Sequence, residues 1–156
     1  MTYLKSFAAA LLIATAPVLA SAENPASAVS VRTVSPQPIV ARTSHSGVFN
    51  GEQVAYTATV AENFVYDEHG APQGYLTTIA YVRVGVADPA SRPIMFLFNG
   101  GPGASSSPLH MGAFGPRRRD GSSTVENPLS PLNAFDLVFI DPVGTGFSRV
   151  FAQADG

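Results

Sequence analysis

The sequence predicts an α/β fold in which a mixed sheet carries two glycine-rich loops. Two short apolar runs, Ile94–Phe98 and Phe135–Ile140, each lead into a glycine-rich segment, and such runs are typical of strands buried on both faces of a sheet. The 14 Gly and 13 Pro among 156 residues favour frequent turns over long helical bundles or coiled coils. With 46% hydrophobic and 13% charged residues, the composition is that of one modest globular domain.

Charge and cysteine content exclude several classes of function. The chain has 9 basic and 11 acidic residues, so it offers no general electrostatic attraction for nucleic acid or for an anionic membrane surface. It contains no cysteine, which excludes disulfides, thiolate catalysis and cysteine-ligated zinc.

The first 22 residues have the pattern of a secretory signal peptide. Lys5 precedes the uncharged, apolar stretch Phe7–Leu19, and Ala20-Ser21-Ala22 follows it in the small-x-small pattern of a cleavage site. A membrane anchor is the alternative, but the stretch of about 13 residues is shorter than the roughly 20 that span a bilayer. We therefore expect cleavage near Ala22, a periplasmic or secreted protein, and no stable membrane association afterwards.

The remainder divides into a leader and a domain. Residues 23–46 include three prolines and show neither helical nor alternating periodicity, so we expect a flexible leader. Residues 47–156 are expected to form the domain.

Strand patterns begin early in this domain. Val54–Val60 and Asn63–Tyr66 are dense in β-branched and aromatic residues, and Asp67–Gly70 has turn composition, which predicts a hairpin-like start. Tyr75–Val86 carries apolar residues at both alternating sets of positions. It is therefore expected to be a long strand inside a sheet.

The loop Asn99–Gly103 follows the first apolar run and is the strongest candidate for chemistry. Its glycines allow backbone N–H groups to approach a ligand closely. Ser106 stands where a dinucleotide-binding Gly-x-Gly-x-x-Gly motif needs its third glycine, and the Gly-Lys-Ser/Thr ending of a phosphate-binding P-loop is absent from this loop. The loop instead favours an oxyanion hole, in which an N–H meets a carbonyl oxygen as it gains charge.

Four blocks of sequence resemble the serine carboxypeptidases of the α/β-hydrolase fold. These blocks are Phe96–Ser106, Gly115-Pro116, Asn127 before Pro-Leu-Ser, and Phe139–Ser148. The resemblance extends from about Gly47 to Arg149. It implies a partial α/β-hydrolase sheet, comprising only the N-terminal strands of a mixed sheet with helices.

The resemblance also implies a function and its residues. In that family the side chain at Asn99 binds the free carboxylate at the substrate's C-terminus, the N–H at Gly100 assists, and the N–H at Gly101 lines the oxyanion hole. The implied enzyme is a serine-type carboxypeptidase that removes C-terminal residues from peptides by serine acyl transfer, without metal or organic cofactor. The implied partner is a peptide with a free C-terminus, and the block after Ile140 is assigned to shaping the pocket.

Two departures from the family pattern bear on the type of carboxypeptidase and on whether this chain can be active. Ala104 stands where many family members have cysteine, which points to a bacterial type. No serine occupies a Gly-x-Ser-x-Gly elbow, and neither Thr145 nor Ser148 is assigned as a nucleophile. The chain is therefore expected to be an N-terminal fragment without the triad, inactive and poorly soluble alone, with both apolar strands exposing faces and edges.

Two alternatives to an active carboxypeptidase stay open at this point. In the first alternative, the chain is a catalytically inactive truncated product. In the second, it is part of another α/β hydrolase, such as an aminopeptidase or esterase.

Other titratable residues are interpreted as structural or solvated. His45, His69 and His110 precede any possible elbow, whereas the catalytic base follows it in these hydrolases. Asp136 and Asp141 are expected in strand-end or turn roles. Arg117–Arg119 is interpreted as a solvated run, with a minor anion-steering patch as the alternative.

Overall fold

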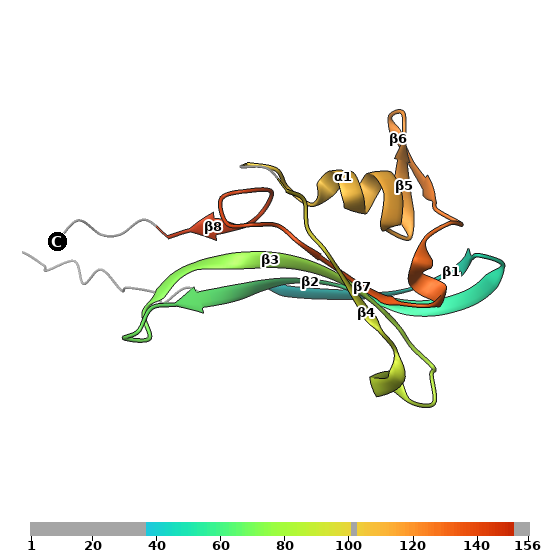
Figure 1. The fold of residues 1–156 in the computed structure, drawn as a ribbon, viewed down its shortest axis with the longest axis horizontal. Coiled ribbons are helices and arrows are strands. Elements are labelled where there is room, and N and C mark those ends of the chain that lie inside the picture. The colour runs from blue at the N-terminus through green and yellow to red at the C-terminus, as the bar shows by residue number, and fades with distance from the viewer. Residues whose placement is uncertain (1–36, 101–102, 152–156) are drawn as a thin grey trace, which may run out of the picture. The chain divides into compact units, whose positions relative to one another are not determined.

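The protein is described by a computed structural model that covers residues 37–100 and 103–151, and six strands of these residues form one sheet (Figure 1). The strand order is β1-β2-β3-β7-β4, and β8 pairs with one end of β3. The strands of this sheet are β1 (Val40–Phe49), β2 (Glu52–Tyr66), β3 (Pro72–Arg83), β4 (Ile94–Leu97), β7 (Asp136–Ile140) and β8 (Arg149–Val150).

β1 and β2 form an antiparallel hairpin that corrects the predicted leader boundary. The turn between them is Asn50-Gly51, and both residues have positive φ, 51° and 83°, as a two-residue hairpin turn requires. Residues 40–46, assigned above to the flexible leader, are therefore strand. The sequence pattern of a strand is hard to recognise in these residues because β1 carries few apolar residues. The Asn-Gly turn is nevertheless a local sequence signal for the hairpin.

β2 and β3 form the second hairpin, at the predicted turn. β2 is one continuous strand where the pattern indicated two segments. The Asp67 carboxylate accepts hydrogen bonds from the backbone N–H groups of His69 and Ala71, at 2.9 and 2.8 Å, and so closes the turn. β3 lies between β2 and β7, which confirms its predicted place inside the sheet.

The sheet is mixed because β7 runs antiparallel to β3 and parallel to β4, as predicted. The expected exposure of the second apolar run is wrong: β7 has a hydrogen-bonded strand on each side, and Leu137 and Phe139 are fully buried. The expectation is confirmed for the first run. β4 is an edge strand, and Ile94, Phe96 and Phe98 are 54%, 60% and 63% exposed.

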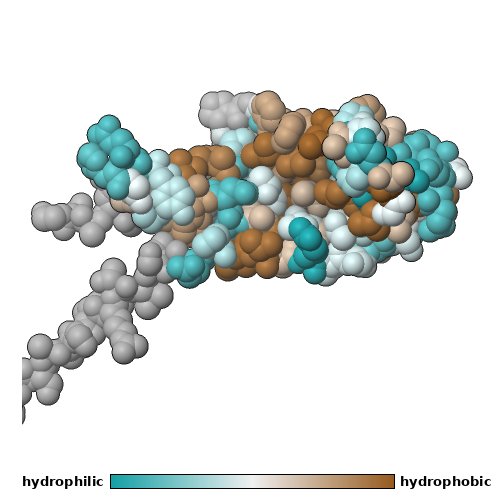
Figure 2. Space-filling view, turned by 90° about the horizontal axis from the view of Figure 1, so that it is seen from below, coloured by the Kyte–Doolittle hydropathy of each residue, from teal (hydrophilic) through white to brown (hydrophobic). Residues whose placement is uncertain are grey.

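Figure 1 shows α1 and the β5–β6 hairpin on one side of the sheet, whereas η1 (Pro89–Ser91), the short helical turn between β3 and β4, lies on the other side. Figure 2 views the molecule from below, and apolar side chains gather along the middle of that surface. The elements on the covered side are α1 (Ser107–Leu109), η2 (His110–Phe114), β5 (Arg117–Asp120), β6 (Ser123–Glu126) and η3 (Pro131–Asn133).

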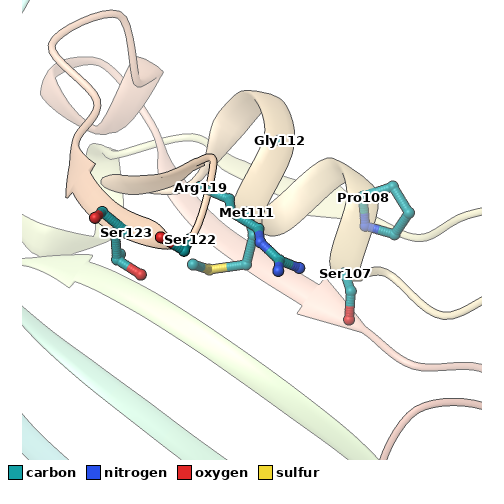
Figure 3. A pocket seen from close by; sticks show the side chains of 8 residues that line it. Ser107, Pro108, Met111, Gly112, Arg119, Ser122 and Ser123 are labelled. Atoms are coloured by element: carbon teal, nitrogen blue, oxygen red, sulfur yellow. The ribbon is translucent and has the colours of Figure 1, made fainter.

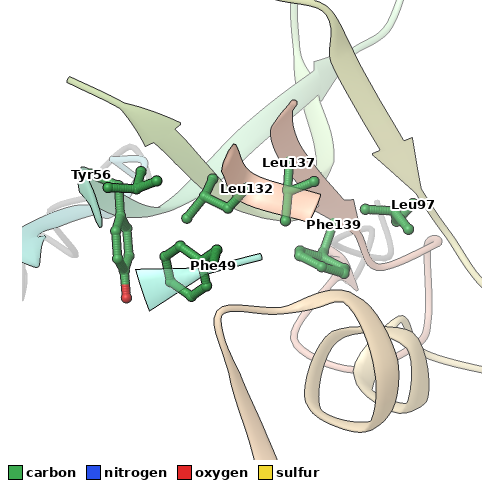
Figure 4. Close-up of a cluster of buried hydrophobic side chains, with 7 residues drawn as sticks. Phe49, Tyr56, Leu97, Leu132, Leu137 and Phe139 are labelled. Atoms are coloured by element: carbon green, nitrogen blue, oxygen red, sulfur yellow. The ribbon is translucent and has the colours of Figure 1, made fainter. Parts of the chain in front are cut away.

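The hydrophobic core lies between the sheet and these covering segments (Figure 4). Its buried members come from the first two strands, the two parallel strands and η3. They are Phe49, Val54, Tyr56, Leu97, Leu132, Leu137 and Phe139. Leu109 and Phe114 pack against this cluster from α1 and η2, so the core fixes the segment that follows the first glycine-rich loop.

A charged pair anchors η3 to the start of the parallel strands. Arg92 Nε donates to Asp136 Oδ1 at 2.9 Å, and both side chains are nearly buried. Arg92 also donates to the Leu132 carbonyl at 3.1 Å. Asp136 therefore has the strand-end role expected of it.

Candidate functional site

The two glycine-rich loops meet at one edge of the sheet. β4 and β7 are parallel neighbours, with Leu97 opposite Phe139, so the segments that follow them leave from the same end. The first loop begins at Phe98 and the second at Asp141. Ligands of open α/β sheets bind in the crevice outside the carboxyl ends of such strands, which makes this edge the candidate site.

Asn99 and Gly100, near the start of the first loop, have few contacts with the other described residues. Asn99 is half-buried and Gly100 is exposed. The Asn99 side chain makes no hydrogen bond to any other residue that the structure describes. Apart from its neighbours in the chain, no described residue has an atom within 4 Å of the position a Cβ would take on Gly100. Their polar groups are therefore available to a ligand. Gly101, the predicted oxyanion donor, lies outside the described residues.

Asp141 joins the first loop to the second. Its Oδ1 accepts hydrogen bonds from the backbone N–H and the hydroxyl of Ser106, both at 2.8 Å. Its Oδ2 accepts one from the Phe147 N–H at 3.1 Å. The carboxylate is buried, and a carboxylate that receives three hydrogen bonds is well satisfied there. One side chain thus sets the distance between the end of the first loop and the turn of the second.

The second loop is held by its own hydrogen bonds. The buried Ser148 hydroxyl donates to the Asp141 carbonyl at 2.7 Å and accepts from the Thr77 N–H at 2.8 Å. Gly146 has a φ of 50°, and a Cβ there would overlap the Asp141 carboxylate. Only glycine fits this position. The loop is therefore a fixed support, consistent with a role in shaping the site.

His110 anchors the chain beyond the first loop. Its Nε2 lies 2.6 Å from the Tyr81 hydroxyl, and its ring lies 4.6 Å from that of Phe139. Burial lowers the pKa of His110, an effect that the nearby Asp141 charge opposes. Burial also raises the pKa of Tyr81 to about 12. A neutral imidazole packed on the core is structural, as the sequence predicted.

The remaining candidates lie away from this edge. His45 belongs to β1, not to a leader, and its ring stacks on Tyr56. His69 is solvated in the β2–β3 turn. Arg117–Arg119 lies in β5, and all three side chains are exposed. Within residues 37–100 and 103–151, no three His, Asp or Glu side chains gather closely enough to hold a metal ion.

Sequence reasoning missed the connecting role of Asp141. It assigned this residue to a strand end, and the residue does follow β7 directly. Its partner Ser106 lies 35 positions earlier, so no local pattern links the two. The available signal was an Asp between a buried strand and a glycine-rich loop, a position where a carboxylate must find backbone donors.

A hollow of about 680 Å³ lies beyond the first loop, between α1–η2 and the β5–β6 hairpin (Figure 3). Neither Asn99 nor Gly100 lines it. No helix in the described part of the chain has the length and apolar character that crossing a membrane requires.

Known proteins resemble the part of the chain that carries both loops. Residues 80–155 match the family model of the serine carboxypeptidases, a shorter stretch than the resemblance expected from about Gly47. Two relatives from Arabidopsis thaliana, serine carboxypeptidase-like 46 and serine carboxypeptidase-like 36, are 40% identical over 72 residues and 44% identical over 67 residues. These matches cover 44% and 41% of this chain but only 15% and 14% of the relatives.

A solved structure gives the same assignment for the fold. Kex1(delta)p, a prohormone-processing carboxypeptidase from Saccharomyces cerevisiae, matches with a TM-score of 0.50 and 27% identity. The match covers 59% of this chain and 21% of the yeast chain, so the mixed sheet corresponds to a small part of that enzyme. The family match, the plant relatives and this structure all show that this part of the chain is similar to serine carboxypeptidases.

Proposed function

We propose that this chain contributes the N-terminal part of an α/β-hydrolase domain to a serine-type carboxypeptidase. The enzyme removes C-terminal residues from peptides by serine acyl transfer. Its partner is a peptide with a free C-terminus, and the reaction uses no metal or organic cofactor. The missing cysteine at Ala104 supports a bacterial type.

One observation carries this proposal. The two loops leave adjacent parallel strands at the same edge, and Asp141 connects them through Ser106 and Phe147. The family match includes both loops. Asn99 is partly exposed and Gly100 is exposed, and the Asn99 side chain has no hydrogen bond within the described residues; this is the part proposed to meet substrate.

The proposed roles follow from the chemistry of these groups. The Asn99 amide donates to the substrate's terminal carboxylate, and the Gly100 N–H adds a second donor. The Gly101 N–H donates to the carbonyl oxygen as it becomes an oxyanion. Placing carboxylate donors next to the oxyanion donor restricts cleavage to the last peptide bond, because both ends of one residue must fit between them.

The nucleophile is proposed to lie outside these 156 residues, together with the Asp and His of the triad. The matched relatives are much longer than the segment they share with this chain, which supports this view. Ser148 is unsuited to attack a substrate because it is fully buried and both bonds of its hydroxyl are taken within the fold. Thr145 is also buried, and its hydroxyl donates to the Pro142 carbonyl at 2.8 Å.

We also propose export through the signal peptide of residues 1–22, with cleavage near Ala22. Its residues lie outside the described part of the chain, so the proposal depends on the sequence pattern alone. N-terminal sequencing of the exported protein tests it: a mature chain that begins near Glu23 is expected, and retention of Lys5 would contradict cleavage.

Binding of matched peptides tests the carboxylate site without requiring a nucleophile. An N-blocked dipeptide with a free C-terminus is titrated against the chain and compared with its C-terminal amide. The free acid is expected to bind more tightly, and Asn99→Ala should weaken binding of the acid more than binding of the amide, by about 10-fold or more, because one hydrogen bond to a charged group is lost.

Asn63→Ala is the matched control because this asparagine is exposed on β2, away from the loop. It should change neither affinity. Equal weakening of acid and amide by Asn99→Ala would contradict a carboxylate site at Asn99. Turnover of the same N-blocked peptides by the complete protein separates a carboxypeptidase from an aminopeptidase, which needs a free amino terminus.

A further inference from the structure

The hollow between α1–η2 and the β5–β6 hairpin has the composition of a ligand site and is separate from Asn99-Gly100. Its volume of about 680 Å³ is large enough for a small organic molecule. Both walls contribute to it: Ser107, Pro108, Met111 and Gly112 from the helical segments, and Arg119, Ser122, Ser123 and Thr124 from the hairpin.

Arg119 is the charged group of this hollow. No Asp or Glu is among the residues that line it. Its Nε donates to the Gly121 carbonyl at 3.1 Å, and its two terminal nitrogens make no hydrogen bond or salt bridge to any residue that the structure describes. Figure 3 shows the guanidinium between Ser122 and Ser107, beside the Met111 thioether. The lining therefore offers a fork of donors without a counter-charge.

Hydroxyl groups surround this fork on both walls. Thr124 lies opposite Arg119 on the partner strand, Ser122 and Ser123 follow in the hairpin, and Ser107 faces them from α1. Hydroxyl and guanidinium donors together recognise oxyanions, and two parallel guanidinium bonds match the two oxygens of a carboxylate. The Met111 thioether and Pro108 supply an apolar surface for the rest of a ligand.

We propose that this hollow binds a small carboxylate-bearing ligand, with Arg119 as the residue that holds its carboxylate. A carboxylate is favoured over phosphate because one guanidinium balances one negative charge, whereas phosphate carries nearly two at neutral pH. The site is independent of the proposed carboxypeptidase function, since it uses neither Asn99 nor the glycine-rich loop.

The hairpin provides its own matched control for charge. Arg118 is adjacent to Arg119 on β5, but successive side chains of a strand point to opposite faces, and Arg118 is not among the lining residues. Arg118→Gln and Arg119→Gln therefore remove the same charge from the same exposed strand. Only the second removes a donor from the hollow.

The test is a titration of the full chain with N-acetylalanine, followed through the backbone NMR signals of Ser122, Ser123 and Thr124. N-acetylalanine amide is the uncharged comparison, and inorganic phosphate is titrated separately. We expect saturable shifts with N-acetylalanine and none with the amide. Arg119→Gln should weaken binding about 10-fold or more, and Arg118→Gln less than about 2-fold.

Three results would overturn this site. The first is an absence of saturable shifts with N-acetylalanine. The second is equal weakening of N-acetylalanine binding by Arg118→Gln and Arg119→Gln, which would indicate only a long-range effect of charge. The third is tighter binding of phosphate than of N-acetylalanine. Asn99→Ala should leave the hairpin shifts unchanged, because it alters only the proposed carboxylate donor of the first loop. Failure at one site is therefore distinguishable from failure at the other.

Discussion

The two glycine-rich loops have similar composition and positions but differ in how their polar groups are hydrogen-bonded. Both follow parallel strands at the same edge of the sheet. The loop after β7 is tied by the buried side chains of Asp141 and Ser148. In the loop after β4, Asn99 is partly exposed and Gly100 is exposed, and neither has such bonds within the described residues.

This difference in hydrogen bonding indicates that the second loop has a structural role and that the first loop is suited to binding a ligand. Side chains whose polar groups are already paired have no donors left for a ligand, but they can hold a neighbouring segment in place. A loop with free donors can bind, provided something else fixes its position. Asp141 supplies that connection through Ser106, so substitutions in the second loop should affect folding and substitutions at the start of the first should affect ligand binding.

Removal of the Asp141 carboxylate should have the largest effect. Asp141→Ala leaves the buried N–H and hydroxyl of Ser106 and the part-buried N–H of Phe147 without their acceptor, so we expect a loss of about 3 to 5 kcal/mol in the free energy of unfolding. Asn99→Ala should change it by less than about 0.5 kcal/mol. Urea denaturation followed by circular dichroism measures both.

Asp120→Ala controls for the loss of one negative charge, since Asp120 is exposed at the end of β5. It should leave the unfolding midpoint nearly unchanged. If Asp141→Ala were as mild as Asp120→Ala, the second loop would not be the support described here.

The two loops should also differ in their tolerance of a methyl group. Gly146→Ala forces positive φ on a residue with a Cβ and pushes that atom into the Asp141 carboxylate, for an expected loss of about 2 to 4 kcal/mol. Gly100→Ala meets open space and should cost less than about 1 kcal/mol. A comparison of the two thermal midpoints tests this, and similar losses would contradict it.

Ser148→Ala sharpens the same distinction at a smaller scale. The variant removes the acceptor of the Thr77 N–H and the donor to the Asp141 carbonyl, so we expect a loss of about 1 to 3 kcal/mol. Ser105→Ala, in the first loop, should cost less than about 0.5 kcal/mol because Ser105 Oγ accepts only a long 3.4 Å bond from the Ser107 N–H. Equal denaturation midpoints for the two variants would argue against a buried role for Ser148.

The sequence predicts the features that depend on neighbouring residues. The apolar runs locate β4 and β7, and Asp67–Gly70 locates the turn between β2 and β3. β1 was missed because its strand character depends on pairing with β2 more than on its own composition. Propensity is a weak guide for such a polar strand.

The features that escape prediction depend on distant residues. The edges of β7 are paired because β3 and β4 flank it, and Leu137 and Phe139 are buried in the core cluster with Phe49. Both the pairings and this cluster join segments far apart in the chain. The role of Asp141 depends on Ser106 in the same way. A family resemblance identifies Asn99 and Gly100 as candidates, but only the fold distinguishes the loop that supports from the loop that is free.

The smallest expected effect is the pH dependence that His110 gives to the segment beyond the first loop. Burial lowers the pKa of His110 below its ordinary value of 6.5, so the unfolded chain takes up the proton first as pH falls. The free energy of unfolding should therefore keep its full value above about pH 6.5 and decrease below it.

His110→Gln removes the titrating group, and its urea midpoint should fall less between pH 7 and pH 5 than that of the parent chain. His69→Gln is the control, since His69 is solvated. If His110→Gln retained the same decrease as the parent, protonation of His110 would not be the cause of the pH dependence.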